Sequence, residues 1–184
     1  MKNILVSTDF SQPAYAAAFF AAELARQTNA RLILFHAYHP AILLEEETIW
    51  ADTGLLEKEV QERIDQLAHE LHKTFGLSVT RVLKPGFAVD EMLAVGKKIK
   101  ADLLIIGTEG AGKRAKNGPG KICQEVLKKA EMPVICLPPN TTPAQYATLL
   151  LDPPNSQLLG NTAGTEAYKK IVADLAQTNL LKTA

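Results

Sequence analysis

The chain has 184 residues, enough for one α/β domain with a tail and too few for two α/β domains of usual size. Acidic and basic residues number 20 each, so the overall charge favours neither a nucleic-acid-binding protein nor an acidic disordered tail. The stretch MKNILVSTDF has one cation and a very short apolar run, unlike a signal peptide, and no apolar stretch reaches membrane-spanning length. We therefore expect a cytoplasmic protein with no membrane or nucleic-acid partner.

Short apolar strands alternate with amphipathic helices through the first 139 residues. The predicted strands are Asn3–Ser7, Arg31–Ala37, Ser78–Lys84, Asp102–Ile106 and Pro133–Leu137. Four helices are predicted between these strands. The first follows Ser11, the second begins at Leu56, the third begins at Val89 and the fourth follows Gly120. This alternation predicts an α/β domain with right-handed crossovers and a parallel sheet that helices cover on both faces.

Parallel sheets of this kind bind ligands where the carboxyl ends of their strands meet and the strand order reverses. Three predicted turns lie at that edge, namely Ser7–Ser11, Ala37–Pro40 and Gly107–Lys121. Asp9 in the first turn is a carboxylate that can accept hydrogen bonds from a ribose or an adenine amino group. A carboxylate at this position can also serve only to cap the helix that follows.

The third turn is rich in glycines and cations. Its glycines are Gly107, Gly110, Gly112, Gly118 and Gly120, and its cations are Lys113, Arg114, Lys116 and Lys121. Glycines let backbone amides approach a ligand, and the cations suit an anion. The helix predicted after Gly120, with Ile122, Val126, Leu127 and Ala130 at helical spacing, directs its free amides back at this loop. The turn therefore has the outline of a phosphate site.

One reading of the loop is a P-loop, because Gly107–Lys113 matches G-x-x-x-x-G-K and follows an apolar strand. Arg114, however, stands where a P-loop needs a Ser or Thr hydroxyl for magnesium. The predicted helix also begins only after Gly120, too late to place Lys113 at its N-terminus. Both features argue against a P-loop.

A second reading uses Gly107, Gly110 and Gly120, which fit G-x-x-G-x9-G and resemble the nucleotide-binding loop of the universal stress protein family. Further features agree with this resemblance in the same order: the strand ending in Thr8-Asp9, the LILFHA strand, the Pro85-Gly86 turn, ADLLIIGT and MPVICLP. The resemblance covers Met1 to Pro139. It is specific in combination, because each piece alone recurs by chance in α/β proteins.

The resemblance implies a Rossmann-like, three-layer αβα domain with a five-stranded parallel sheet, similar to the adenine nucleotide alpha-hydrolase-like fold, over residues 1–139. In the ATP-binding branch of the family such a domain holds ATP, with or without Mg²⁺. The implied nucleotide contacts are Thr8, Asp9, Ala37, Ile106, Gly107, Gly110, Gly120, Lys121 and Ile122, and further phosphate contacts are Lys113, Arg114 and Lys116. The resemblance also implies a homodimer through the last strand edge, Val134, Ile135, Cys136 and Leu137.

Lys121 departs from the family pattern, in which a Ser or Thr follows the last glycine. Its ammonium can neutralise phosphate charge, or the loop can be a solvated basic segment. The first alternative gives a stress protein that binds ATP or a related adenine nucleotide as a regulatory ligand, with slow hydrolysis at most. The second gives an interaction module that acts through dimerisation and protein partners. A phosphotransferase or NTPase is a third alternative.

The remaining motifs indicate neither catalysis nor metal binding. His69 and His72 are three positions apart, whereas H-E-x-x-H needs four, and no nucleophile with a matched base is visible. Cys123 and Cys136 share no C-x-x-C spacing, so we expect buried free thiols. His36 or His39 can line the pocket, although strand-end histidines often serve only packing or solvent roles.

The tail, residues 140–184, differs in character from the rest of the chain. Three groups of turn-forming residues divide it, around Pro143, Pro153 and Gly160. A short strand over 146–151 and a helix over 165–181 are predicted within it. The tail is interpreted either as a dimer extension or as part of a second repeat.

Overall fold

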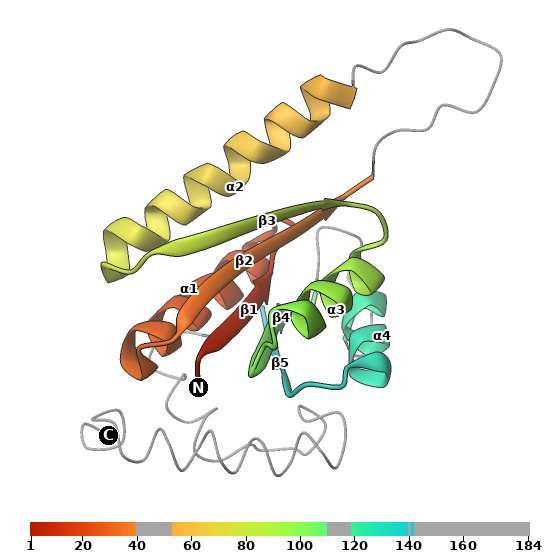
Figure 1. Cartoon of the computed structure of the whole chain (residues 1–184). Coiled ribbons are helices and arrows are strands. Elements are labelled where there is room, and N and C mark those ends of the chain that lie inside the picture. Colours follow the sequence, from red (N-terminus) through yellow and green to blue (C-terminus); the bar gives the residue numbers. More distant parts are fainter. Residues whose placement is uncertain (40–52, 110–118, 140, 142–184) are drawn as a thin grey trace, which may run out of the picture.

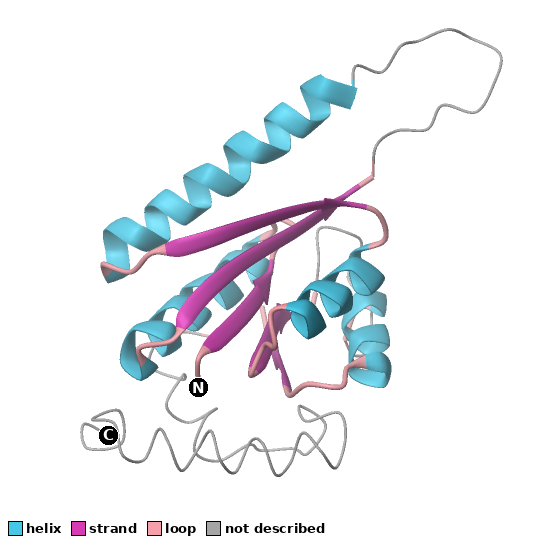
Figure 2. Ribbon diagram, viewed as in Figure 1, coloured by secondary structure: helices cyan, strands magenta, loops and turns pink. Residues whose placement is uncertain are grey.

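The computed structural model describes residues 1–39, 53–109, 119–139 and 141, within which five strands alternate with four helices (Figure 1, Figure 2). The strands are β1 (Asn3–Ser7), β2 (Arg31–Tyr38), β3 (Val79–Pro85), β4 (Leu103–Gly107) and β5 (Val134–Leu137). The helices are α1 (Gln12–Thr28), α2 (Thr53–Phe75), α3 (Ala88–Lys98) and α4 (Lys121–Lys129). These elements match the predicted order, although α2 begins at Thr53 rather than at Leu56.

The five strands form one parallel sheet in the order β3-β2-β1-β4-β5. The central strand β1 pairs with β2 on one side and with β4 on the other, so that Leu5 lies opposite both Ile33 and Leu104. The chain adds strands outward from β1 to β3 and then returns to the other side for β4 and β5. The strand order therefore reverses between β1 and β4, which is the switch point of a doubly wound sheet. The predicted five-stranded parallel sheet is confirmed.

Side chains of β1 alternate between two helical layers. Ile4 and Val6 belong to the core that the sheet shares with α1 and α2, whereas Leu5 belongs to the core shared with α3 and α4. All three side chains are fully buried. Figure 1 shows the resulting arrangement, with α1 and α2 on one side of the sheet and α3 and α4 on the other. The predicted three-layer αβα architecture is confirmed by this packing.

Helix α1 begins as its sequence predicts. The Ser11 hydroxyl accepts a hydrogen bond from the Ala14 backbone N–H at 3.4 Å, and Pro13 lies in the first turn. The helix ends at Asn29, whose backbone adopts the left-handed conformation with φ of 52°. Its buried face consists largely of alanine, which permits close packing on the sheet.

Helix α4 differs from its prediction in which face is buried. Ile122 was expected on the apolar stripe with Val126 and Ala130, but it is 49% exposed. Cys123 takes that place and is buried with Val126 and Ala130. These three residues have the i, i+3, i+7 spacing of one helical face, which leaves Ile122 on the neighbouring face. The helical spacing of Ile122 is confirmed, and its exposed side chain lies among the residues that line the pocket.

No helix in the described ranges is long and apolar enough to cross a membrane. The strand predicted over 146–151 and the helix predicted over 165–181 lie outside the described residues. The boundary between domain and tail at residue 139 stays a prediction.

Two glycines with positive φ offer a matched test of the backbone. Gly86, in the turn after β3, has φ of 135°, and a Cβ there would lie 3.1 Å from Glu91 Cγ. Gly76, after α2, has φ of 68° with open space around it, a conformation close to that of Asn29. We expect Gly86→Asn to lower the free energy of unfolding by roughly 1 to 3 kcal/mol, because φ of 135° suits only glycine.

The matched substitution Gly76→Asn should change that free energy by no more than about 0.5 kcal/mol, because asparagine tolerates the left-handed region. Urea denaturation followed by circular dichroism measures both values. Equal effects of the two substitutions would contradict the account of the Pro85-Gly86 turn.

Candidate functional site

A pocket of about 450 Å³ lies at the carboxyl edge of the sheet. The ends of β1, β2 and β4 form its floor, and the first turns of α1, α3 and α4 form its walls. Its volume is within the usual range for sites that bind small molecules. The pocket therefore occupies the edge at which parallel sheets of this topology bind ligands.

Most of the residues predicted to contact a nucleotide lie together in this pocket. The predicted contacts that line it are Thr8, Asp9, Ala37, Ile106, Gly107, Gly120, Lys121 and Ile122. Gly110, Lys113, Arg114 and Lys116 lie outside the described residues. The structure thus brings the described candidates together, while their contact with a nucleotide stays a prediction.

Further lining residues were not among the predicted nucleotide contacts: Ser7, Ala14, His36, Ala88, Met92, Thr108, Glu109 and Cys123. Ala88 and Met92 stand one turn apart on α3. Their spacing indicates a helix face, but no feature of the sequence directs that face to the pocket. His36 was considered from its place at the end of β2, and it does line the pocket.

Thr8 is fixed where β1 meets β2. It is 3% exposed, and its N–H donates to the Phe35 carbonyl at 2.9 Å. Its hydroxyl accepts a hydrogen bond from the Phe10 N–H at 2.9 Å, and its carbonyl lies 2.7 Å from His36 Nδ1. Phe10 has φ of 60°, so the turn is tight. The floor of the pocket is therefore held by backbone contacts between neighbouring strands.

Asp9 supports the N-cap residue of α1, while its predicted contact with a nucleotide stays a prediction. Its Oδ1 accepts hydrogen bonds from the Ser11 N–H at 3.0 Å and from the Ser11 hydroxyl. Ser11 is in turn the N-cap of α1. The carboxylate thus supports the turn before α1, and it also lines the pocket as an exposed side chain.

His36 is held as a neutral imidazole with a defined tautomer. The Thr8 carbonyl can only accept, so the ring proton must lie on Nδ1 and Nε2 is left as an acceptor. Burial lowers the pKa of His36, and the charge of Arg63 acts in the same direction, whereas the Thr8 hydrogen bond and the charge of Asp9 act against it. The net effect favours the neutral form at neutral pH.

Phe10 contacts both the His36 ring and Arg63 of α2. The rings of Phe10 and His36 have centroids 4.6 Å apart, and the Arg63 guanidinium carbon lies 4.4 Å from the centre of the Phe10 ring.

Thr108 and Gly120, on either side of the glycine loop, are joined by a backbone hydrogen bond. The Gly120 N–H donates to the Thr108 carbonyl at 2.7 Å, which closes the base of the loop. A Cβ on Gly120 would lie 3.3 Å from that same carbonyl, and one on Gly107 would lie 3.2 Å from the Pro13 carbonyl carbon. Both glycines therefore allow close backbone approaches, which gives a structural reason for them beside the predicted nucleotide contact.

The N-terminus of α4 opens into the pocket without a side-chain cap. Gly120 is the N-cap residue and has no side chain to cap the helix, and the Gln124 N–H donates to the Gly120 carbonyl. The amides of Lys121, Ile122 and Cys123 precede that bond, so helix geometry gives them no partner within α4. All three residues line the pocket. Such an arrangement suits an anion, and phosphate in particular.

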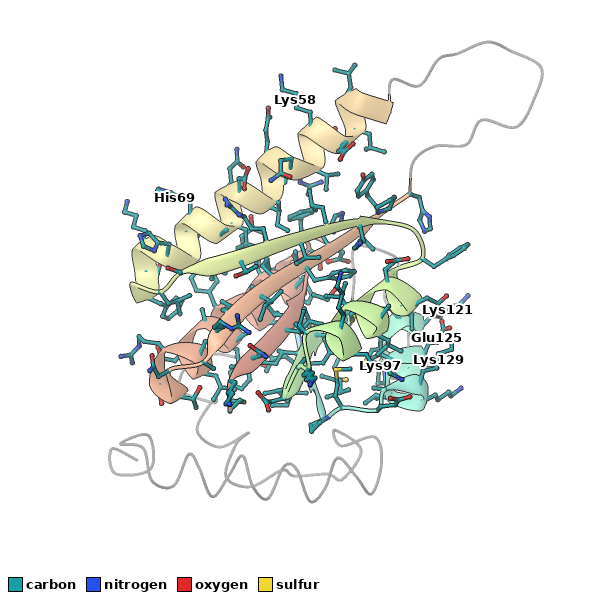
Figure 3. All side chains as sticks on the ribbon, in the orientation of Figure 1. Lys58, His69, Lys97, Lys121, Glu125 and Lys129 are labelled. Atoms are coloured by element: carbon teal, nitrogen blue, oxygen red, sulfur yellow. The ribbon has the colours of Figure 1, made fainter. Side chains whose placement is uncertain are left out.

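Lys121 adds a cation at this helix N-terminus. Figure 3 shows it on α4 before Glu125 and Lys129. Lys129 pairs with Glu125 at 2.6 Å and with Asp90 of α3 at 3.3 Å, while no ion pair joins Lys121 to another residue of the described part. The helix also begins at Lys121, eight positions after Lys113, which confirms the spacing that argued against a P-loop.

Within the described ranges, no group of three or more His, Cys, Asp or Glu side chains could hold a metal ion. The fold and the pocket define a doubly wound α/β protein with a ligand pocket at the switch point of its sheet. They do not by themselves identify the ligand.

Comparison with known proteins places this α/β protein in a family. The profile of the Universal stress protein family matches residues 1–138. A Thermus aquaticus protein named universal stress protein in QAH/OAS sulfhydrylase 3′ region is 30% identical over 135 residues, covering 73% of this chain and 96% of the relative. The chain therefore belongs to the universal stress protein family, as its motifs predicted.

Solved structures show the same fold. The universal stress protein UspA from Lactobacillus plantarum has a TM-score of 0.62 at 21% identity, covering 74% of this chain and 97% of that one. The universal stress protein from Archaeoglobus fulgidus in complex with dAMP has a TM-score of 0.57 at 21% identity, covering 74% of this chain and 98% of that one.

The state of His36 predicts how stability depends on pH. The imidazole of the unfolded chain has a pKa of about 6.5, and that of the folded protein is lower. Between the two values the unfolded chain binds a proton that the folded chain does not, so the free energy of unfolding falls as the pH drops below about 6.5. Urea denaturation at several pH values from 7.5 to about 5 would measure this fall.

His36→Asn serves as the control, because its amide can keep the donor to the Thr8 carbonyl without titrating. We expect a smaller loss of stability in this variant over the same pH range. His39, His69 and His72 are present in both proteins and cancel in the comparison. Equal slopes in the two proteins would contradict the assignment.

Proposed function

We propose that this member of the universal stress protein family binds ATP or a related adenine nucleotide in the pocket at the carboxyl edge of its sheet, as a regulatory ligand in stress response. The single observation that carries the proposal is that one pocket joins an apolar wall to the uncapped N-terminus of α4. The dAMP complex of the Archaeoglobus fulgidus relative supports an adenine nucleotide as the ligand class.

The apolar wall suits a purine base. Ala37, Ala88 and Met92 present small or flexible apolar groups on the side of β2 and α3. The nearby His36 Nε2 is an acceptor in the tautomer that its bond to Thr8 requires. An exocyclic amine is a donor that fits such an acceptor, which favours adenine over guanine, whose corresponding group is a carbonyl.

The phosphate end is assigned to the first turn of α4. The amides of Lys121, Ile122 and Cys123 supply donors without partners in the helix, and the partial positive charge of the helix N-terminus adds to them. The Lys121 ammonium would neutralise phosphate charge in place of the hydroxyl that is usual in the family. Mg²⁺ would bind through the phosphates, because magnesium keeps several waters and few protein ligands.

The ligand is proposed as regulatory rather than as a substrate. The described pocket residues include carboxylates and one neutral histidine, but no nucleophile paired with a base has been identified among them. Hydrolysis is accordingly expected to be slow at most. The cytoplasmic location stays a prediction.

Isothermal titration of the full chain with ATP and Mg²⁺ tests this proposal. We expect Lys121→Ala to weaken ATP binding roughly threefold to tenfold, since one charge contact at a partly exposed site contributes about 0.7 to 1.4 kcal/mol. The same substitution should weaken AMP binding less, because AMP has fewer phosphate charges. GTP should bind the wild-type protein more weakly than ATP does.

The matched control is Lys128→Ala, which removes an exposed cation from the other end of α4. It should leave ATP affinity unchanged. If the folded wild-type protein shows no heat at millimolar ATP, nucleotide binding is ruled out and the interaction-module alternative is favoured. Equal losses in the two lysine variants would remove Lys121 from the site and leave only an effect of net charge.

We also propose a homodimer through β5, and the contrast between the two edge strands supports it. At the β3 edge Arg81, Lys84 and Pro85 are exposed, and such residues prevent a strand from pairing with another chain. The β5 strand, Val134–Leu137, carries no charge. Of the two edges in the described sheet, β5 is therefore the better template for strand addition.

The register of β5 suggests a substitution that would test this edge. The Pro133 and Leu137 carbonyls accept from Leu104 and Thr108, so alternation directs the backbone groups of Val134 toward the open edge. We expect light scattering to give twice the 20.0 kDa chain mass for the wild type. Val134→Pro should give a monomer, because it removes the outward N–H.

Val134→Ala trims the buried side chain but keeps the N–H, so it should remain dimeric. A monomeric wild type would refute the proposed dimer. A dimeric Val134→Pro variant would move the interface to another surface.

A further inference from the structure

The two cysteines of the chain meet in the core between the sheet and its α3–α4 layer. Cys123 is in the first turn of α4 and Cys136 is in β5, and their sulphur atoms are 2.9 Å apart. Each residue is 2% exposed, and both are free thiols. The chain has 2 cysteines in all, so each thiol has only the other as an intramolecular partner.

The two sulphur atoms are close enough to form a disulfide after a small movement. A disulfide needs a sulphur separation of about 2.05 Å, so the two atoms have to approach by roughly 0.9 Å. Rotation of two side chains can supply a movement of this size without a change of fold. The cysteines lie on different elements, so the bond would join the N-terminal turn of α4 to β5.

The two cysteines differ in their relation to the pocket. Cys123 forms part of the pocket wall beside Lys121 and Ile122, whereas Cys136 is not among the lining residues. Cys136 lies opposite Ile106 in the β4–β5 pairing, on the strand next to the pocket floor. The two thiols are therefore unequal, because Cys123 belongs to a residue of the pocket wall and Cys136 does not.

Electrostatics point to the same difference. The two thiols share a hydrogen bond, and this bond lowers the pKa of Cys123 despite its burial. The pKa of Cys136 is raised by its hydrogen bond with Cys123, by its burial and by the charge of Cys123. The thiolate is the reactive form of cysteine, and the N-terminus of a helix stabilises it.

We propose that Cys123 and Cys136 are a peroxide-sensitive dithiol, in which Cys123 reacts first and Cys136 resolves it to an intramolecular disulfide. The Cys123 thiolate attacks one oxygen of hydrogen peroxide, so that an S–O bond forms, the O–O bond breaks and hydroxide leaves. Cys136 then loses its proton and attacks the Cys123 sulphur, an S–S bond forms, and the second oxygen leaves as water. Two thiols and one peroxide give one disulfide and two waters, and the two electrons pass from sulphur to peroxide.

The experiment treats the reduced full chain with hydrogen peroxide and counts thiols in denaturant with a thiol-reactive dye. We expect a loss from 2 thiols per chain to none, reversed by dithiothreitol, with a mass decrease of about 2 Da for the two hydrogens lost. Trypsin cuts after Lys128 and Lys129, which separates the two cysteines. A linked peptide containing Cys123 and Cys136 therefore identifies the bond.

Two variants test the order of reaction. In Cys136→Ser the sulfenic acid at Cys123 has no resolving thiol and should be trapped by dimedone, whereas Cys123→Ser should give little adduct. Retention of both thiols in the treated wild type, or linkage only between chains, would overturn the proposal. An adduct confined to Cys136 would overturn the assigned order. The linked wild-type peptide decides whether the bond forms even where a variant does not fold.

Discussion

The burial of β1 on both faces is the constraint on which the rest of the structure depends. Ile4, Leu5 and Val6 are fully buried, and alternate side chains belong to cores under different pairs of helices. Backbone groups can emerge only at the ends of such a strand, because buried polar groups need partners. The parallel order then places the carboxyl ends of β1, β2 and β4 and the starts of three helices at one edge. The pocket is a consequence of this arrangement.

The polar groups around the pocket are held mainly by backbone contacts. Thr8 joins β1 to β2, the His36 ring is held by the Thr8 carbonyl, and Gly120 is tied to Thr108. Side chains held in this way lose little conformational freedom when a ligand arrives, which reduces the entropic cost of binding. The site therefore differs from the surface ion pairs of α4, such as Lys129 with Glu125, which are exposed and contribute little to stability.

The sequence was sufficient for the order of elements and for the edge that carries the pocket. Strand runs such as NILVS and LLIIG are short and apolar, so their pattern is unambiguous. It was not sufficient for the rotation of α4, because Ile122 and Cys123 are adjacent apolar residues and only packing decides which is buried. The place of Met92 in the apolar wall of the pocket and the contact between Cys123 and Cys136 could not be predicted either. Both depend on how elements that are separate in the sequence pack together.

Helix α4 retains a feature that lowers its own stability. A Ser, Thr or Asp at the N-cap would add a few tenths of a kcal/mol relative to glycine. Gly120 instead leaves the amides of Lys121, Ile122 and Cys123 to the pocket. An anion bound there would satisfy them and stabilise the helix. Cys123 also contacts Cys136 of β5, so the same short helix packs both on the pocket and on the edge strand of the sheet.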